Sequence, residues 1–252
     1  MTIELLSRQE LQLRNKHGLR YPLAVAEKDY VLGIVLKILY HSNLQDVLVF
    51  KGGTALHHTY LPQLRFSQDL DFTGLRKVTV DELKSVFDVY EFLEVKKHHT
   101  SAATVKIERL QYRGLLATPA SLRLVIDFMQ NVVLPAKRLA YKNVYGVDTK
   151  VKVMDIQEIC AEKIRAMNER FRYRDFYDFG MIMKEFKFDL STIVKLLKRK
   201  ELRKPLALNN ILEHWRLASQ AKDFAHIHLT KEIGDDEVAA YLTKIPLDEI
   251  AT

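Results

Sequence analysis

The feature that most constrains the fold is a change in hydrophobic periodicity near residue 154. Before that point, short apolar runs typical of strands lie between segments with helical spacing. After it, apolar residues recur only at helical spacing. The pattern predicts an α+β fold, with a small mixed sheet flanked by helices and then a C-terminal bundle of helices. The expected domains cover residues 1–153 and 154–252.

The same spacing predicts the individual elements. In the first domain we expect helices over residues 5–15, 24–41, 54–61 and 81–95. We expect strands over residues 46–51, 64–73, 102–112 and 122–129, with further short strands within 142–153. In the second domain we expect helices over residues 155–171, 175–186, 190–199, 205–220 and 235–243.

Composition narrows the class of protein. The 252 residues include 9 glycines and 6 prolines, too few for a collagen-like or long low-complexity chain. The single cysteine, Cys160, excludes an internal disulfide and suits a reducing cytoplasm. The most apolar stretch, residues 30–40, is well below the roughly 20 residues of a membrane span, so no membrane partner is expected. The formal net charge of +7 favours a polyanionic partner.

Two acids, Asp69 and Asp71, stand two residues apart in an expected strand. Because side chains alternate along a strand, both carboxylates point the same way, while Leu70 and Phe72 point into the core. Two parallel carboxylates repel each other and usually need a cation, and Mg²⁺ is the typical one where phosphates also coordinate it. The alternative is a pair of solvated acids on a polar strand face.

The preceding residues favour the metal interpretation. Lys51-Gly52-Gly53-Thr54 follows a strand, and glycines allow backbone N–H groups and the Thr54 hydroxyl to approach a phosphate. A third acid, Asp127, ends a strongly apolar strand, where solvation explains it poorly. Three acids on neighbouring strands can hold two Mg²⁺ ions, so Asp127 is a candidate third ligand.

These residues resemble a known family motif. Lys51-Gly-Gly-Thr54, followed by Arg65-Phe-Ser67-Gln-Asp69-Leu-Asp71-Phe72, is similar to the first motif of the AbiEii-like nucleotidyltransferases. That family belongs to the DNA polymerase β-type superfamily and includes the MenT-type toxins. Residues 27–32 are similar to its N-terminal helix signature, and residues 162–166 and 174–178 to its two C-terminal motifs.

The resemblance implies a nucleotidyltransferase core over residues 1–153 and a helical domain after it. It implies Mg²⁺ as cofactor and an NTP as donor. Some characterised members transfer the nucleotide to the 3′ end of tRNA, which stops translation, so we expect an RNA acceptor here, with the tRNA 3′ end as the leading candidate. Many members are toxins of toxin–antitoxin or abortive-infection systems, so a cognate antitoxin is an expected partner. We also expect a monomer.

The residues and the resemblance together predict the site. The predicted catalytic residues are Asp69, Asp71, Lys163 and Asp175. The predicted nucleotide-binding residues are Lys51, Gly52, Gly53, Thr54, Ser67, Arg165 and Asp178. The predicted metal ligands are Asp69, Asp71 and Asp127. His57 and His58 follow the glycines and are further candidates for lining a nucleotide pocket.

Lys163 lies on the apolar stripe of its helix, four residues after Ile159. One interpretation is a buried stem whose amine reaches water; the other, which we favour, is a cation at a cleft wall that binds triphosphate. Asp175 and Asp178 lie one turn apart in the next helix. Asp175 either interacts with the helix dipole or pairs with Lys163 or an arginine.

Two groups of basic residues are candidates for binding RNA. The first surrounds the junction near residue 170, where Phe171 and Tyr173 are interleaved, and the second covers residues 195–204. Aromatic rings between bases can stack on unpaired nucleotides. The predicted RNA-binding residues are Arg170, Arg172, Arg174, Lys198 and Arg199. The alternative for each group is a solvated helix face.

Three functions stay open on this basis. The leading one is Mg²⁺-dependent transfer of a nucleotide from an NTP to RNA. The second is the same chemistry on a small molecule or a protein hydroxyl. The third is an enzymatically silent module that binds nucleotide or RNA.

Overall fold

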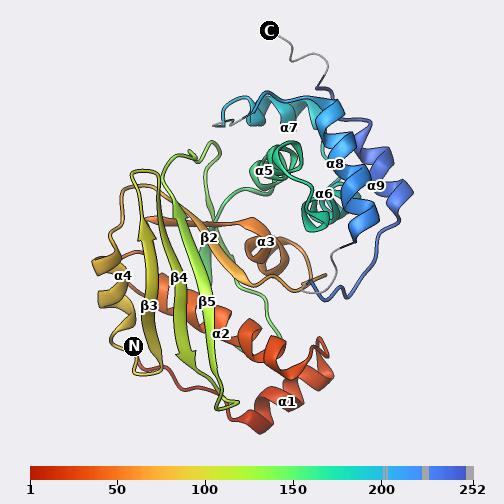
Figure 1. The fold of residues 1–252 in the computed structure, drawn as a ribbon. Helices are drawn as coiled ribbons and strands as arrows, with labels where there is room; N and C mark the ends of the chain where they lie inside the picture. The colour runs from red at the N-terminus through yellow and green to blue at the C-terminus, as the bar shows by residue number, and fades with distance from the viewer. Residues whose placement is uncertain (201, 203, 223–226, 248–252) are drawn as a thin grey trace. The chain divides into compact units, whose positions relative to one another are not determined.

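The computed structural model describes residues 1–200, 202, 204–222 and 227–247 (Figure 1). The chain divides into two compact units, Met1–Met154 and Asp155–Thr252. The sequence predicted this division one residue earlier, after residue 153. None of the described helices is long and apolar enough to cross a membrane.

A mixed seven-stranded sheet forms the centre of the first unit. Its strand order is β3-β4-β5-β2-β1-β7-β6. The strands are β1 (Leu48–Lys51), β2 (Asp69–Gly74), β3 (Leu93–Thr100), β4 (Thr104–Arg113), β5 (Pro119–Asp127), β6 (Lys137–Ala140) and β7 (Lys150–Val153). Strand β2 pairs antiparallel with β1 and parallel with β5, so the strand with the two acids lies inside the sheet.

Helices complete the first unit. They are α1 (Arg8–His17), α2 (Leu23–Tyr40), α3 (Gly52–Ala55), the π-helical turn η1 (Leu56–Tyr60) and α4 (Val80–Phe87). Helices α1 and α4 begin with capping boxes. The Ser7 and Thr79 hydroxyls each accept a hydrogen bond from the backbone N–H three residues later, and the glutamate at that position accepts one from the backbone N–H of Ser7 or Thr79. These boxes satisfy backbone N–H groups that have no partner within the helix.

The core of this unit lies between α2 and one face of the sheet (Figure 1). Helix α2 is buried over most of its length because its sequence is apolar on nearly every side. The Tyr40 ring lies 6.5 Å from that of Phe72, and its hydroxyl donates to the carbonyl groups of Leu48 and Lys152. Phe72 of β2 therefore faces α2, which leaves the opposite sheet face for the two acids.

Two sequence predictions were wrong at the edges of the sheet. Residues 81–95 were predicted as one helix, but α4 ends at Phe87 and Leu93–Thr100 forms β3. Strand β6, the other edge, was not predicted at all. Only Leu93 is buried in β3 and no residue in β6, so neither edge shows the alternation of a half-buried strand.

The boundaries of β2 were also wrong. A strand was predicted over residues 64–73, whereas β2 begins only at Asp69. Residues 61–68 are buried at several positions without being part of the sheet. This apolar run was predicted as a strand because its residues are apolar for burial and not for pairing within the sheet.

The second unit carries helices wherever the sequence predicts them. They are α5 (Ile156–Glu169), α6 (Tyr173–Phe186), α7 (Leu190–Leu197), α8 (Leu208–Ala221) and α9 (Asp235–Leu242). Cys160 is buried in α5, as expected, and burial raises the pKa of its thiol. That these helices form a bundle stays a prediction.

Candidate active site

Asp69 and Asp71 lie on the same face of β2. Leu70 and Phe72 between and after them are fully buried, whereas both acids are partly exposed. The alternation predicted from the sequence is therefore confirmed. Two carboxylates share a solvent-accessible strand face next to a closed core.

The sheet register sets the neighbours of each acid. Asp71 is the partner of Lys51 at the end of β1, and Asp69 is the partner of Arg123 in β5. The Arg123 Nη2 atom lies 3.2 Å from Asp69 Oδ2. Lys28 of α2 is a second cation that interacts with Asp69. Burial lowers the pKa of Lys28, and the negative charge of Asp69 partly offsets this effect. The repulsion between the two acids is thus reduced by cations already in the fold.

The Gly-Gly turn approaches the acids closely. Gly52 has a φ of +77°, and a Cβ there would lie 2.8 Å from Asp71 Oδ2. A Cβ on Gly53 would lie 2.9 Å from Ser67 Oγ and would overlap the Arg65 guanidinium. The two positions therefore exclude a side chain, and the turn's backbone sits directly beside Asp71 and Ser67.

Thr54 supports the start of β2. Its side chain is buried, and its hydroxyl donates a 2.5 Å hydrogen bond to the carbonyl oxygen of Asp69. Ser67, two residues before Asp69, is half-buried. The predicted contacts of both residues with a nucleotide stay predictions.

Asp127 lies on the same sheet face but has its own partners. It is the register partner of Thr73, and its Oδ2 lies 3.6 Å from Lys51 Nζ. Its Oδ1 accepts hydrogen bonds from the backbone N–H groups of Met129 and Gln130. Within the described ranges, no three His, Cys, Asp or Glu side chains lie close enough to share a metal ion. The described part of the chain thus has no preformed three-acid cluster, and Asp127 as a metal ligand stays a prediction.

The remaining pair is still suited to Mg²⁺. This ion prefers oxygen ligands and is usually held by one or two carboxylates together with substrate phosphates. Asp69 and Asp71 provide two carboxylates on one face, beside the Gly-Gly turn. The donor set therefore fits a magnesium ion whose other ligands come from a phosphate substrate and water.

In the second unit, Lys163 belongs to a buried network of charges. Its Nζ lies 3.0 Å from Asp175 Oδ1 and 2.6 Å from Asp178 Oδ2. The Arg170 Nε donates a 2.8 Å hydrogen bond to Asp175 Oδ2. Burial alone would raise the pKa of Asp175, but Lys163 and Arg170 outweigh it and hold that pKa below its ordinary value.

This network decides between the interpretations of α6. The prediction that Asp175 pairs with Lys163 or an arginine is confirmed, since it pairs with both. Asp178 pairs with Lys163 as well. Arg165 lies 3.5 Å from Glu169 within α5. Binding of triphosphate by Lys163 and of nucleotide by Arg165 and Asp178 stays a prediction.

The two basic groups differ in exposure. Near the α5–α6 junction, Arg170 and Arg172 are exposed and Arg174 is half-buried. In the second group, Lys198 and Arg199 are exposed. Residues 201 and 203 of that group lie outside the described residues. The assignment of RNA to these side chains stays a prediction.

Lys200 does not belong to an RNA surface. Its side chain is fully buried, and its amine pairs with Glu158 and Glu162 of α5. This buried lysine anchors the segment after α7 to α5. Lys200 was predicted to belong to a basic group because the sequence alone does not distinguish a buried charge from an exposed one.

His57 and His58 are fully buried in η1, and their predicted place at a nucleotide pocket stays a prediction. His58 Nε2 lies 3.3 Å from Asp29 Oδ1, and its ring stacks on Tyr141 at 4.4 Å. Gln63 donates a 2.6 Å hydrogen bond to Asp29 Oδ2. These contacts fix η1, which directly follows the Gly-Gly turn, against α2. The sequence feature that could have predicted these contacts is Asp29, an acid within the apolar sequence of α2.

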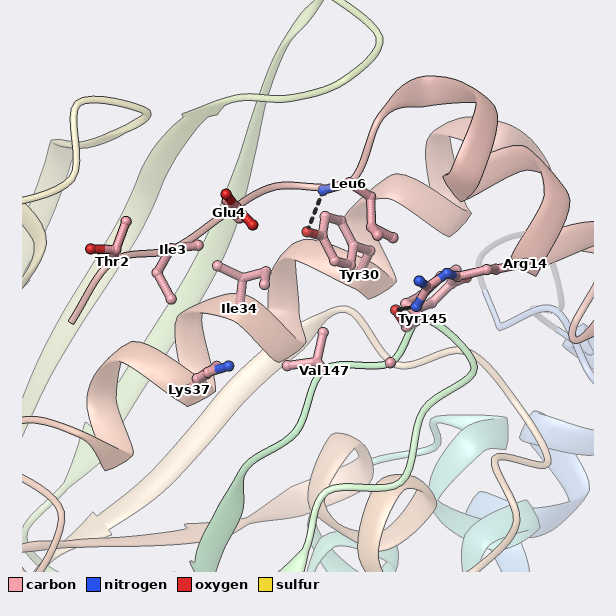
Figure 2. Close-up of a pocket in the computed structure, with 11 residues that line it drawn as sticks. Thr2, Ile3, Glu4, Leu6, Arg14, Tyr30, Ile34, Lys37, Tyr145 and Val147 are labelled. Carbon is pink, nitrogen blue, oxygen red and sulfur yellow. Dashed lines mark hydrogen bonds between the residues drawn. The ribbon is translucent and has the colours of Figure 1, made fainter.

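Figure 2 shows a pocket of about 320 Å³ elsewhere in the first unit. It lies between the N-terminal arm, α1, α2 and residues 145–147. Its charged lining residues are Glu4, Arg14 and Lys37. No predicted site residue lines it, so the acids of β2 are the better candidate for chemistry.

Comparison with solved structures shows the fold. The chain is similar to MenT4, a nucleotidyltransferase toxin from Mycobacterium tuberculosis H37Rv, with 20% identity, a TM-score of 0.72 and coverage of 98% of this chain and 91% of that chain. It is also similar to JHP933 from Helicobacter pylori, with 19% identity, a TM-score of 0.55 and coverage of 90% and 91%. A second H. pylori structure, described as a nucleotidyltransferase, has 18% identity and a TM-score of 0.56 over 92% of this chain and 100% of that chain.

Comparison of the sequence shows the family. A search of curated proteins returned no match. A family model described as nucleotidyl transferase AbiEii toxin, type IV toxin–antitoxin system, matches residues 34–249. That range holds most of the chain, including the Gly-Gly turn, both acids of β2 and the Lys163 network. The chain therefore belongs to the AbiEii family of nucleotidyltransferase toxins from type IV toxin–antitoxin systems.

Proposed function

We propose that this protein is a Mg²⁺-dependent toxin that transfers a nucleotide from an NTP to RNA, with the 3′ end of tRNA as acceptor. The observation that carries the proposal is the pair Asp69 and Asp71 on one accessible face of β2, beside the Gly-Gly turn. The family supplies the reaction class. The net charge of +7 supports a polyanionic acceptor.

In this proposal Asp69 and Asp71 hold the metal. When bound, Mg²⁺ supplies charge neutralisation at the transferring phosphate and activation of the attacking hydroxyl. The N–H groups of the turn at Gly52 and Gly53, together with the Ser67 hydroxyl, bind phosphate oxygens of the donor. Lys51, at the end of β1, adds a cation beside them.

The transfer exchanges the phosphoanhydride bond between the α- and β-phosphates of the NTP for a phosphoester bond to the acceptor. An acceptor hydroxyl attacks the α-phosphorus in line, so an O–P bond forms and the bond between the α-phosphorus and its bridging oxygen breaks. The leaving group is pyrophosphate. The chain contributes chiefly by positioning the reactants and neutralising charge, which is the main source of rate in phosphoryl transfer.

The Lys163 network is the second part of the proposal. We assign Lys163 and Asp175 to catalysis and Arg165 and Asp178 to nucleotide binding, because they lie in the two motifs that resemble the family. The network's four charged groups pair with one another, which supports a fixed orientation of the lysine amine. A cognate antitoxin, a monomeric state and a cytoplasmic location complete the proposal.

The test uses purified protein, Mg²⁺, total tRNA and each of the four labelled NTPs in turn, beside Asp69→Asn. Label on tRNA with the wild type alone would support the acceptor and the role of Asp69 together. Pyrophosphate release without label on RNA would favour a small-molecule or protein hydroxyl as acceptor. Nucleotide binding without pyrophosphate release under any condition would favour a silent binding module and contradict the proposal.

A further inference from the structure

Phe171 is exposed on the second unit, between two arginines. It is 54% exposed, and it is the one aromatic residue among the large exposed apolar side chains of the described residues. Single exposed apolar residues are common on proteins, so exposure alone indicates little. The neighbours of Phe171 make the difference, since they are positively charged and held in place.

The backbone around Phe171 is extended. Arg170 has φ −156° and ψ 155°, and Arg172 has φ −94° and ψ 116°, so the segment joins α5 to α6 without a helical turn. Side chains alternate along an extended segment. The Arg170 and Arg172 side chains therefore leave the segment on the other side from Phe171, and the Phe171 side chain stays 54% exposed.

Arg170 and Phe171 are held by contacts within the second unit. Arg170 is bound to the buried carboxylate of Asp175, the same carboxylate that pairs with Lys163. The ring of His214 lies 6.2 Å from that of Phe171, and His214 Nδ1 is 2.7 Å from the carbonyl oxygen of Met167. A platform that is already ordered loses little conformational entropy when a ligand binds to it.

The other aromatic residue of this junction is differently placed. Tyr173 is 5% exposed, and its ring stacks on that of Trp215 at 6.0 Å. It belongs to the core of the second unit. Of the two aromatic residues interleaved with the arginines, only Phe171 therefore offers a ring face to a ligand.

We propose that Phe171 is a stacking platform for an unpaired base of the RNA acceptor, with Arg170 and Arg172 meeting the adjacent phosphates. The inference rests on the proposed RNA acceptor and adds the surface that binds it. Every base has a π-face, so this contact tolerates any sequence but requires an unpaired nucleotide. The exposed arginines that precede and follow Phe171 in the chain favour a nucleic acid over an apolar protein partner.

The test is fluorescence anisotropy of the full chain with labelled single-stranded RNA and, separately, a blunt RNA duplex. Phe171→Ala is expected to weaken single-strand binding by about 10- to 100-fold, with an unchanged slope of affinity against salt. Phe171→Trp is expected to retain binding. Arg172→Ala is expected to weaken binding and reduce the salt slope by about one. The matched control is Leu13→Ala, which removes a similarly exposed apolar side chain of the first unit and is expected to change nothing.

A second readout reports stacking itself. A 2-aminopurine base in the single strand is expected to be quenched by the wild type and not by Phe171→Ala. Thermal unfolding of the variants is expected to match the wild type, because the substituted side chain is exposed.

Several outcomes would overturn the inference. If Phe171→Ala and the wild type bound RNA with equal affinity, the proposed stacking role of Phe171 would be contradicted, while the proposed function would be unaffected. If Phe171→Ala instead lost only the binding of a co-purified antitoxin, this surface would be a protein interface. Absence of RNA binding by the wild type, with pyrophosphate released on another acceptor, would contradict both the platform and the proposed RNA acceptor.

Discussion

At the scale of single residues, the site depends on the alternation of side chains along one strand. Asp69 and Asp71 were predicted to share a face because Leu70 and Phe72 had to be buried, and the structure has this arrangement. The sequence did not predict that Arg123 would pair with Asp69. That contact depends on the register between β2 and β5, which no local pattern encodes.

The Arg123 ion pair leads to a prediction about metal affinity. Since Arg123 occupies one carboxylate oxygen of Asp69, it competes with a metal ion for that ligand. Arg123→Gln is expected to tighten Mn²⁺ binding by about 1.5- to 5-fold, as the loss of an exposed ion pair would allow. Electron paramagnetic resonance of free Mn²⁺ measures this directly. Arg113→Gln, at an exposed position in β4, is the control, and equal affinities for both variants would refute the competition.

Gly52 gives a second prediction at this scale. An alanine there must adopt a φ near +77° and place its Cβ against Asp71. Gly52→Ala is expected to lower the free energy of unfolding by about 1–2 kcal/mol and to reduce transfer, because Asp71 must move. Chemical denaturation and the labelled-NTP assay measure the two effects. Gly234→Ala is the matched control, since a Cβ there meets nothing within 4 Å. Similar losses in both variants would contradict the close-approach argument.

At the scale of elements, the sequence predicted those whose burial follows a period. Helices α2 and α5 and strand β5 have continuous or periodic apolar faces, and all were expected near their observed positions. The edge strands β3 and β6 were missed because they are largely exposed and carry charges. Edge strands take their place from pairing with a neighbour, which their own composition does not reveal.

The charge network between α5 and α6 predicts a large loss of stability. Lys163→Met leaves the buried carboxylates of Asp175 and Asp178 without their shared cation. The free energy of unfolding is expected to fall by about 3–5 kcal/mol, as for other broken buried pairs. Lys231→Met removes an exposed ion pair with Glu185 and is expected to cost at most about 1 kcal/mol. Urea denaturation of both variants makes the comparison, and equal losses would show that burial of the Lys163 network contributes nothing extra.

The same network predicts a dependence of stability on pH. The pKa of Asp175 is lower in the folded protein than in the unfolded chain, because Lys163 and Arg170 favour its charged form. Its contribution is therefore fully present above the unfolded pKa of about 3.9 and is lost as the pH falls through the lower folded pKa. The stability difference between the wild type and Asp175→Asn is expected to be constant from pH 7 to pH 5 and to shrink below about pH 4. Denaturation curves across this range measure it, and a difference that shrinks above pH 5 would contradict the assignment.

At the scale of the whole molecule, the net charge supports the proposed polyanionic acceptor, and the family supplies the reaction class. The net charge of +7 is modest, and Lys200 shows that part of a basic run can be buried rather than exposed. The composition alone therefore overstated the second basic group. The motifs identified the family because both the fold and the chemistry restrict the spacing of their residues. The family model matches residues 34–249.

The central claim is that Asp69 and Asp71 hold the metal for nucleotide transfer. The most direct measurement is transfer of labelled nucleotide to tRNA by the wild type and by Asp69→Asn, together with Mn²⁺ binding and thermal unfolding of both. We expect label with the wild type alone, weaker Mn²⁺ binding by Asp69→Asn, and similar unfolding midpoints. Transfer at the wild-type rate by a folded Asp69→Asn protein would contradict it.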